Sequence, residues 1–445
     1  MVCLLYGSLT AAVQEQKENY VVIISIDGFP AEALWDQTIS LPTIRSLALS
    51  GAWAEAMIPS SPASTWINHK TLVTGVHPEK HGLVTNGKII MGESGAPVGR
   101  DNDLDWDELS TYPTLHGLAF GSGLKTAEVN WPNTRNDPSL HYGFPDAINE
   151  VESMTPQLRT ELIELGLLAD ETSRSFQRDN GAVVRDYVWT ETAAHLIRTR
   201  QPNLLLLHLL NVDGTHHRHG SGGWPGATAL SLADRNVREI LHALDDAGIR
   251  DQTTLFLVSD HGFMNVTKSV NPNVLFRQNG LIEVDDSGRI THTSLHVSGG
   301  AMGMIYATNP DSRNEDLARA REILTGTEGI ATVIGPEEYH KYGLPLPSEN
   351  EQMGDLVLGA AEGFSIGGSA NEDDAVIELS DVRGTHGYLN NMPQMETLFI
   401  AAGRGIKSGT VLKTVDNRSV APTAAWFLGL RLETADGNIL EEIIE

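Results

Sequence analysis

The chain has 445 residues, with 31 lysine and arginine residues against 58 aspartate and glutamate residues, which gives a formal net charge of −27. This charge argues against general nucleic-acid binding, because phosphate backbones are held by lysine and arginine. Apolar runs such as Val21–Ile24 and 204–207 are far shorter than the roughly 20 residues that span a bilayer, which excludes a polytopic membrane protein. The single cysteine, Cys3, excludes intrachain disulfides and a cysteine-rich zinc site, whereas 16 histidines leave metal binding by histidine and aspartate open.

The first 19 residues form a separate segment, which we expect to be a leader or a signal remnant (1–19). Residues 2–13 are mostly apolar and include the small residues Ala11 and Ala12, and a polar stretch over 14–19 follows. This order is similar to the later part of a secretory signal, but the positively charged start is missing. The apolar start favours a periplasmic or secreted location and leaves a cytoplasmic one open.

Strands and helices alternate from Tyr20 onward. Residues 20–26 are a β-branched apolar run typical of a buried parallel strand, and Asp27-Gly28 follows it directly. We expect further strands over 125–130, 203–210 and 254–259, and helices over 41–50, 183–200 and 230–244, the last closed by Gly248. This alternation predicts an α/β fold, with a mostly parallel central sheet flanked by helices on both faces.

The pattern changes after residue 264. We expect a strand over 301–308, a helix over 314–324 and a strand over 329–334, followed by a stretch rich in proline and glutamate. This predicts a small inserted α/β subdomain over 265–379, between a first part of the catalytic core over 20–264 and its return over 380–445. In the return we expect a loop over 383–391, a strand over 397–401 and a helix over 421–428.

Candidate metal ligands are spread over four separate segments, mostly next to glycine and at the ends of predicted strands. They are Asp27, Asp213, His217, Asp260, His261 and His386. In open α/β sheets ligands bind beyond the carboxyl ends of the strands, so the three aspartates should meet at one edge. Carboxylate and imidazole groups suit zinc, and three aspartates with three histidines are enough for two adjacent sites.

Each of these segments has an ordinary structural explanation when it is taken alone. An Asp-Gly pair after a strand is usually a turn, and an isolated Asp-His pair is usually structural. Four such segments together favour a functional site. Two divalent cations would bring a charge of about +4 against three carboxylates, leaving a local positive charge that could hold an anionic substrate despite the acidic chain.

Seven segments resemble the alkaline phosphatase superfamily, and specifically its nucleotide pyrophosphatase/phosphodiesterase branch. The resemblance extends from about Tyr20 to the end of the chain and is weakest over the inserted stretch. The matching segments are Asp27-Gly28-Phe29, Ser64-Thr65-Trp66-Ile67-Asn68-His69, 72–75, 77–86, 213–220, Asp260-His261-Gly262 and Gly384-Thr385-His386-Gly387-Tyr388.

The resemblance implies two divalent metal ions, with zinc the expected metal. One ion would be held by Asp213, His217 and His386. The other would be held by a set that includes the nucleophilic hydroxyl, namely Asp27, Thr65, Asp260 and His261. The spacing of Asp213 and His217 agrees, because one helical turn or a tight loop can direct both side chains at one ion.

Thr65 is implied as the nucleophile. Coordination of its hydroxyl to a divalent cation would yield the attacking alkoxide without a separate base. Residue type alone favours a different explanation, in which Thr65 is the N-cap of a helix through 70–73. Both roles can hold together, because a helix N-terminus also favours a phosphoryl oxygen beside it.

Two further residues match positions that bind substrate in the family. Asn86 is implied as the donor to a non-bridging phosphoryl oxygen, although Asn86-Gly87 is also a strong turn dipeptide. Trp66 stands where the family has an aromatic residue that stacks on the leaving nucleoside or aryl group, and core packing explains it equally well.

His216 replaces a usual glycine and His219 adds another imidazole, so either could compete with His217 as the ligand. A further departure is Ile67, which replaces a common proline.

The resemblance implies a metal-dependent phosphodiesterase or nucleotide pyrophosphatase that acts on a small phosphodiester or nucleotide through a covalent phospho-threonine. The stretch 61–64 lacks the Cys/Ser-x-Pro-x-Arg segment of sulfatases. Monoesterases of this superfamily have an arginine close after the nucleophile, and no arginine follows Thr65 closely. We expect Lys70 on the far side of its helix. Alternatives are a phosphonoacetate-type phosphonate hydrolase, for which Lys70, Lys88 or Lys125 could bind the carboxylate, a phosphomonoesterase, and a catalytically silent metal-binding protein. The sequence leaves the oligomeric state open.

Overall fold

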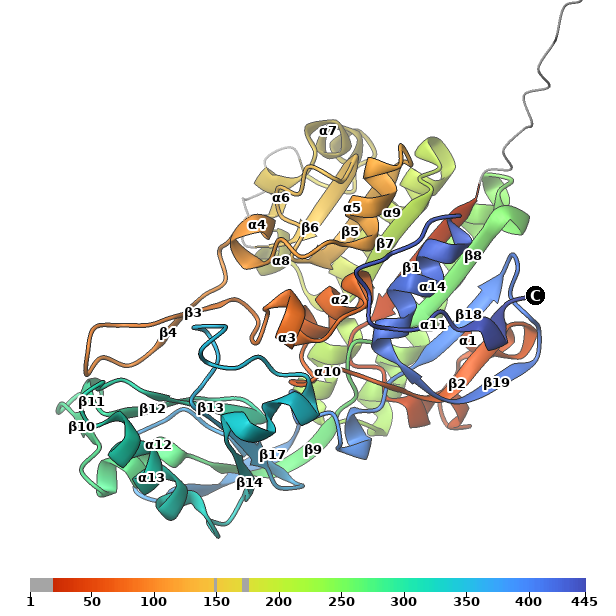
Figure 1. The fold of residues 1–445 in the computed structure, drawn as a ribbon. Coiled ribbons are helices and arrows are strands. Elements are labelled where there is room, and N and C mark those ends of the chain that lie inside the picture. Colours follow the sequence, from red (N-terminus) through yellow and green to blue (C-terminus); the bar gives the residue numbers. More distant parts are fainter. Residues whose placement is uncertain (1–18, 148–149, 170–175) are drawn as a thin grey trace, which may run out of the picture.

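The computed structural model describes residues 19–147, 150–169 and 176–445, so all but the last residue of the expected leader lies outside the described residues. Figure 1 shows a larger lobe built on one long sheet and a smaller lobe built on separate short sheets. No helix among the described residues has the length and apolar character needed to cross a membrane.

Within the described residues, the central sheet has eight strands in the order β19-β2-β18-β8-β1-β7-β5-β6. Strand β1 lies in the middle and pairs in parallel with β7 and β8, whereas β18 runs antiparallel to β8 and β2. The predicted mostly parallel sheet is therefore confirmed. The strands are β1 (Tyr20–Ile26), β2 (Ala52–Ile58), β5 (Thr126–Pro132), β6 (Tyr142–Asp146), β7 (Leu204–Leu209), β8 (Thr253–Val258), β18 (Phe399–Gly403) and β19 (Thr410–Asp416).

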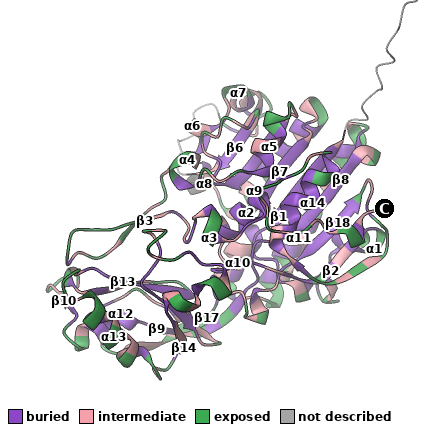
Figure 2. Cartoon of the chain, in the orientation of Figure 1, coloured by how far each residue is buried: buried purple, intermediate pink, exposed green. Residues whose placement is uncertain are grey.

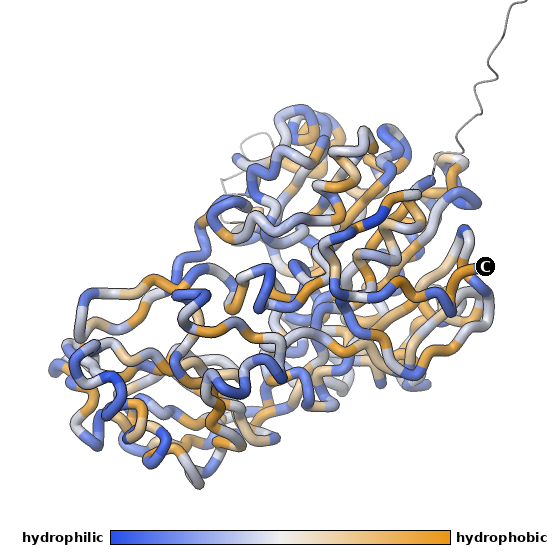
Figure 3. Tube along the Cα trace, viewed as in Figure 1, coloured by the Kyte–Doolittle hydropathy of each residue, from blue (hydrophilic) through white to orange (hydrophobic). Residues whose placement is uncertain are grey.

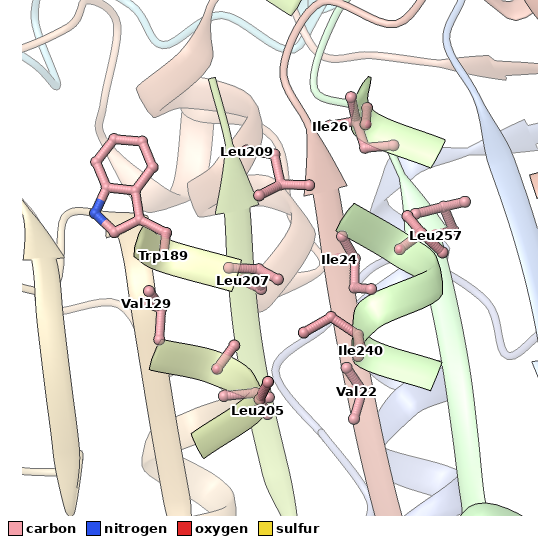
Figure 4. Close-up of a cluster of buried hydrophobic side chains, with 14 of the residues drawn as sticks. Val22, Ile24, Ile26, Val129, Trp189, Leu205, Leu207, Leu209, Ile240 and Leu257 are labelled. Atoms are coloured by element: carbon pink, nitrogen blue, oxygen red, sulfur yellow. The ribbon is translucent and has the colours of Figure 1, made fainter. Parts of the chain in front are cut away.

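Both faces of this sheet are covered by helices, as predicted. Strand side chains alternate between faces, so Ile24 of β1 joins one apolar cluster and Ile23 joins the other. Figure 4 shows Ile24 and its neighbours packed with Trp189 and Ile240 on the first face, and Figure 2 shows that the strands between the helices are buried. The first face is covered by α1 (Pro42–Ser50), α9 (Ala182–Arg200) and α11 (Gly223–Asp246), and the second by α2 (Thr65–Thr74), α5 (Leu115–Gly121) and α14 (Val420–Phe427).

Two of the expected core elements differ from the observed ones. Helix α11 begins at Gly223 rather than near residue 230, because Pro225 lies in the first turn, where a missing backbone N–H costs no helical hydrogen bond. The expected loop over 383–391 is wrong in its first part. Residues 383–385 complete the strand β17 (Val376–Thr385), which pairs with β9 (Met264–Val270). Shorter helices are α3 (Pro78–His81), α4 (Trp106–Leu109), α6 (Glu150–Ser153), α7 (Pro156–Glu164) and α8 (Phe176–Asp179).

The smaller lobe contains a sheet in the order β12-β13-β15-β14 and a sheet in the order β16-β9-β17, with an apolar cluster of its own. Apolar residues recur along these strands in Figure 3. The first and last strands of this stretch, β9 and β17, lie side by side, so the chain leaves and re-enters the larger lobe at one place. The boundaries 265–379 stay a prediction. The remaining elements are β3 (Lys88–Ile90), β4 (Gly99–Asp101), β10 (Ile282–Val284), β11 (Ile290–Thr293), β12 (Leu295–Ser298), β13 (Met302–Ala307), β14 (Ile330–Ile334), β15 (Leu356–Ala360), β16 (Phe364–Ile366), α12 (Pro272–Gln278) and α13 (Arg313–Leu324).

Candidate metal centre and active site

The predicted metal ligands meet at one edge of the central sheet. Asp27 follows β1, and Asp260-His261 follows the neighbouring strand β8. On the other side of β1, strand β7 leads into α10 (Asn211–His219), which carries Asp213 and His217. His386 comes directly after β17, the strand that returns from the smaller lobe. Because the carboxyl ends of parallel strands lie together, residues far apart in the sequence converge here.

The first set of side chains is centred on the Nε2 atom of His261. This atom lies 3.2 Å from Oδ1 of Asp27, 3.3 Å from Oδ2 of Asp260 and 3.3 Å from Oγ1 of Thr65. Asp27, Asp260 and His261 are fully buried, and Thr65 is 9% exposed. The structure therefore brings together all four residues that the sequence assigned to one ion.

The second set consists of Asp213, His217 and His386. Oδ1 of Asp213 lies 3.2 Å from Nε2 of His217 and 3.4 Å from Nε2 of His386, and the two Nε2 atoms are 3.1 Å apart. The rings of His261 and His386 are stacked with their centroids 3.5 Å apart. The two sets are therefore adjacent, and His261 lies between them, since it also brings a ligand atom within 4.8 Å of Asp213 and His386.

All three histidines present the same ring nitrogen to these sets. The Nδ1 atom of His217 contacts the carbonyl oxygen of Gly384 at 3.0 Å, and that of His386 contacts the carbonyl oxygen of Ala63 at 3.1 Å. The Nδ1 atom of His261 is 3.1 Å from the carbonyl oxygen of Gly262. A proton on Nδ1 satisfies each carbonyl and leaves an Nε2 lone pair free to bind a metal.

The site concentrates buried negative charge. Asp27 Oδ1, Asp213 Oδ1 and Asp260 Oδ2 are buried and accept no hydrogen bond from the described residues. Burial and the charge of Asp27 raise the pKa of Asp260 above its usual value. Burial and the neighbouring His261 and His217 hold the pKa of His386 well below 6.5, so this ring stays neutral. Against the effect of burial, the carboxylates in turn raise the pKa of His261 to about 9. Buried carboxylate oxygens that accept no hydrogen bond, together with imidazoles whose Nε2 atoms point at them, fit a divalent cation, which would compensate the negative charge.

Thr65 is the first residue of α2, and Ser64 occupies the N-cap position, so the N-cap explanation of Thr65 is wrong. Ser64 has the extended backbone of a cap residue. The hydroxyl of Thr65 is consequently free of the helix end and faces His261 at 3.3 Å. Thr65 still lies beside the N-terminal N–H groups of α2, and this position suits a phosphoryl oxygen.

The loop before Thr65 is held by a buried asparagine and by the His386 segment. Nδ2 of Asn68 donates to the carbonyl oxygens of Pro62 and Ser64, at 3.2 and 3.0 Å. The N–H of Ala63 donates to the carbonyl oxygen of Tyr388 at 2.9 Å, next to the contact of Ala63 with His386. The nucleophile candidate and a ligand from the distant return of the chain are thus fixed to each other.

Asn86 and Trp66 flank Thr65. Oδ1 of Asn86 accepts from the backbone N–H of Trp66 at 3.0 Å, so its Nδ2 group points the other way and has no hydrogen-bond partner among the described residues. Trp66 is half-buried, and its Nε1 donates to Oδ2 of Asp146 at 3.3 Å. Trp66 is therefore not part of the apolar core, and Asn86 has a donor to spare beside the nucleophile candidate.

The competing side chains lie elsewhere. His216 is buried with its ring edge-on to Phe263, 5.1 Å between centroids, and neither of its ring nitrogens is bonded to a described residue. His219 is exposed. Only His217 of these three reaches Asp213. Nζ of Lys70 donates to the carbonyl oxygen of Ser110 at 2.9 Å, so it is turned away from the site as expected.

His208 is a residue that the sequence analysis missed. It lies in β7, and its Nε2 is 2.9 Å from Oδ2 of Asp27, while its Nδ1 is 2.9 Å from the carbonyl oxygen of Asn130. Burial lowers its pKa, but the hydrogen bond with Asp27 outweighs burial and raises the pKa to about 9. A protonated His208 donates to both oxygens and fixes the orientation of Asp27. The sequence feature that could have identified His208 is its position as a polar residue inside the apolar run 204–209.

Phe263 was also missed. Its ring packs edge-on against the rings of His217, His261 and His386, with centroids 5.1 to 5.7 Å apart. Gly28 leaves room for it, since a Cβ atom at Gly28 would lie 2.5 Å from the Phe263 ring. Phe263 therefore sets the spacing of the three imidazoles from the apolar side.

Comparisons with the sequences of known proteins match this chain over almost its whole length. A venom phosphodiesterase of Crotalus durissus collilineatus is 21% identical over 438 residues, which cover 95% of this chain and 46% of the relative. The chain thus spans about half the length of the venom phosphodiesterases that it matches. Ectonucleotide pyrophosphatase/phosphodiesterase family member 7 of Mus musculus is 23% identical over 453 residues, covering 98% of this chain and 90% of the relative.

A solved structure gives the same fold. It is murine ectonucleotide pyrophosphatase/phosphodiesterase 5, described as an inactive threonine-to-alanine variant in complex with AMP, with a TM-score of 0.70 at 18% identity and coverage of 96% of this chain and 100% of that one. The family described as type I phosphodiesterase / nucleotide pyrophosphatase matches residues 21–389. The chain therefore belongs to the type I phosphodiesterase/nucleotide pyrophosphatase family of the alkaline phosphatase superfamily.

Proposed function

We propose that this protein hydrolyses phosphodiester or phosphoanhydride bonds of small substrates through a covalent intermediate on Thr65 at a two-zinc site. The observation that carries the proposal is the position of the Thr65 hydroxyl, whose Oγ1 lies 3.3 Å from Nε2 of His261 in one cluster with the buried Asp27 and Asp260 carboxylates. A threonine with only a structural role would have no reason to face such a cluster.

The ligand spacings support zinc. Zinc binds nitrogen and oxygen at about 2.0 to 2.1 Å with tetrahedral geometry, which places neighbouring ligand atoms about 3.3 Å apart. In the first set the three separations from His261 Nε2 are 3.2, 3.3 and 3.3 Å. In the second set they are 3.1, 3.2 and 3.4 Å. All three separations in the second set, and the three from His261 Nε2 in the first, match the edge of a zinc tetrahedron, which supports two ions.

In the proposed reaction, Oγ1 of Thr65 forms a bond to phosphorus while the bond from phosphorus to the leaving oxygen breaks in line with it. Bound zinc ions would favour the Thr65 alkoxide, compensate the phosphoryl charge and support the leaving oxygen and the hydrolytic water. The free Nδ2 group of Asn86 donates to a non-bridging phosphoryl oxygen. Water then cleaves the phospho-threonine and restores the hydroxyl.

The surroundings of Thr65 favour a diester over the alternatives. The donor beside Thr65 is the neutral amide of Asn86, which suits the single negative charge of a diester better than a dianionic monoester. Two of the three lysines proposed for a phosphonate carboxylate are occupied, because Nζ of Lys70 donates to Ser110 and Nζ of Lys125 donates to the carbonyl oxygen of Arg200. Lys88, half-buried in β3, is the one that could still serve.

The relatives agree with this proposal. They are named as phosphodiesterases and nucleotide pyrophosphatases, and the murine structure described as inactive carries a threonine-to-alanine substitution and binds AMP. This supports a nucleotide or another small phosphodiester as the substrate. Their names place them in venom or as ecto-enzymes, which supports the export that the apolar start of this chain favours.

The substrate class can be tested with the zinc-loaded protein and a panel of an aryl phosphodiester, an aryl phosphomonoester and phosphonoacetate. We expect the diester to have the highest kcat/KM by at least about tenfold and zinc analysis to give two ions per chain. Chelation should abolish turnover and added zinc should restore it. A preference for either other substrate would replace the proposal with the corresponding alternative, and a metal-free, inactive protein would indicate a silent binding protein.

Replacement of the nucleophile separates chemistry from metal binding. Thr65→Ala should lower kcat by at least about 10⁴-fold, as expected for loss of a covalent nucleophile. Zinc content should persist, because Asp27, Asp260 and His261 remain. Thr65→Ser keeps a hydroxyl and serves as the matched control that retains measurable turnover. Wild-type turnover in Thr65→Ala would contradict the assignment.

Asn86→Ala removes the free amide donor. We expect kcat to fall about 10²- to 10³-fold, which is the range for loss of one donor to a developing oxyanion. Asn86→Asp is the informative companion, because it keeps an acceptor for the Trp66 N–H but replaces the donor with a negatively charged oxygen. It should lose at least as much activity. A loss below about fivefold in both variants would place Asn86 outside the reaction.

His208→Ala leaves Oδ2 of Asp27 without its partner. We expect zinc affinity, measured by competition with a chelator, to fall about 10- to 100-fold, the usual effect of losing a partner that orients a ligand. His242→Ala is the control, since His242 is exposed on α11 and should leave affinity unchanged. Unchanged affinity in a folded His208→Ala protein, checked by circular dichroism, would show that His208 does not hold Asp27.

A further inference from the structure

A cavity of about 610 Å³ opens beside the second set of ligand candidates. His217 lines it from α10, and the other walls come from the strands β9, β16 and β17. The lining residues are His217, Arg218, Val266, Ser269, Ser365, Ile377, Leu379, Arg383, Gly384 and Thr385. None of them is acidic, although the chain as a whole carries a net charge of −27.

The two arginines of this cavity are brought together by one hydrogen bond of the metal centre. Nδ1 of His217 is 3.0 Å from the carbonyl oxygen of Gly384, and each arginine is the direct neighbour in sequence of one of these two residues. The end of α10 is fixed in this position because Asn265 of β9 exchanges two hydrogen bonds with the backbone of Ser221. Arg218 and Arg383 therefore border the same cavity as His217, the member of the second set that lines it.

The charge of these arginines is not compensated by the protein. Neither Arg218 nor Arg383 forms an ion pair or side-chain hydrogen bond with any described residue, and both are exposed. Glu378, on the same strand as Arg383, contacts Nζ of Lys268 at 3.2 Å instead.

A second cavity of the smaller lobe shows the contrast. It has about 570 Å³ and is also lined by two arginines, Arg313 and Arg321. There Arg313 is paired with Asp355, which lines the same cavity, and Nη2 of Arg321 lies 3.4 Å from Oε1 of Glu337. Arginines that border a cavity in this protein can thus be neutralised by carboxylates, and those beside His217 are not.

We propose that Arg218 and Arg383 form a subsite for a second anionic group, a phosphate or a carboxylate, carried by the leaving group of the substrate. This rests on the proposed function, in which the leaving oxygen departs in line with Thr65, on the opposite side of phosphorus. Because Thr65 belongs to the first set of ligand candidates, we place the leaving oxygen next to the second set, Asp213, His217 and His386. An arginine guanidinium pairs with either anion through two parallel N–H donors. Val266, Ile377 and Leu379 form an apolar part of the cavity wall. This wall can contact the apolar part of a leaving group whose charged group binds the arginines.

The kinetic test compares three substrates on the zinc-loaded protein. Two are diesters: bis(4-nitrophenyl) phosphate, which has no second charge, and a diester with a 4-carboxyphenyl leaving group. The third is a dinucleoside diphosphate, a phosphoanhydride whose leaving group carries a phosphate. We expect Arg218→Ala and Arg383→Ala each to lower the kcat/KM of a charged substrate relative to the uncharged one by about tenfold, mainly through KM. Arg383→Lys keeps the charge and should recover part of this loss. The two charged substrates distinguish a preference for carboxylate from one for phosphate.

Arg238→Ala is the matched control, because Arg238 is an exposed arginine on α11 outside this cavity. It makes the same change in net charge and should leave the ratios within about twofold. Equal losses for charged and uncharged substrates, unchanged ratios, or the same loss in Arg238→Ala would overturn the subsite.

Binding measurements keep the subsite testable apart from catalysis. By calorimetry, 4-phosphonobenzoate should bind the zinc-loaded protein about tenfold more tightly than phenylphosphonate, and Arg218→Ala with Arg383→Ala should remove this difference. If the wild-type protein cleaves none of the diesters, the proposed function fails, and the binding difference alone decides the subsite. Equal binding of the two phosphonates by the wild-type protein would overturn it.

Discussion

The structure depends on the burial of three carboxylates at the end of three adjacent parallel strands. Asp27 follows the central strand β1, and Asp260 and Asp213 follow its two neighbours, β8 and β7. Each has a buried oxygen without a hydrogen bond from the described residues. Such an arrangement is unfavourable unless positive charge is close by, and His208 and His261, whose pKa values are raised to about 9, supply only part of it. The ends of these three strands therefore favour the binding of cations.

The side chains around this centre are held by contacts that link distant parts of the chain. His386 is bound to the loop before Thr65 through Ala63, and Gly28, in the turn after β1, donates its N–H to Oδ1 of Asp260 at 3.1 Å. Phe263 packs against the imidazoles from the apolar side. Because each segment is fixed by another, the ligand atoms keep spacings near those of a zinc tetrahedron without help from flexible side chains.

The smaller lobe contributes to the site through β9 and β17. His386 and Arg383 both come from the end of β17, and β9 carries Asn265, which fixes the end of α10. One short pair of strands thus brings a ligand candidate, an uncompensated arginine and a cavity wall to the same side of the metal centre. The reacting group and the rest of the substrate would accordingly be bound by different lobes.

The sequence by itself determined the α/β alternation, the approximate strand ends and the residue types of the candidate metal centre, because hydrophobic periodicity and an Asp-Gly or Asp-His pair after a strand are local signals. It left His216 and His217 undecided. Adjacent residues of a helix point about 100° apart, and only the packing of α10 on β17 decides that His217 faces Asp213. His208 was hidden in an apolar strand, and the extension of β17 through residue 385 depends on pairing with β9. These features, like the placement of Arg218 and Arg383 on one cavity, join residues far apart in the sequence, so only the tertiary structure could decide them.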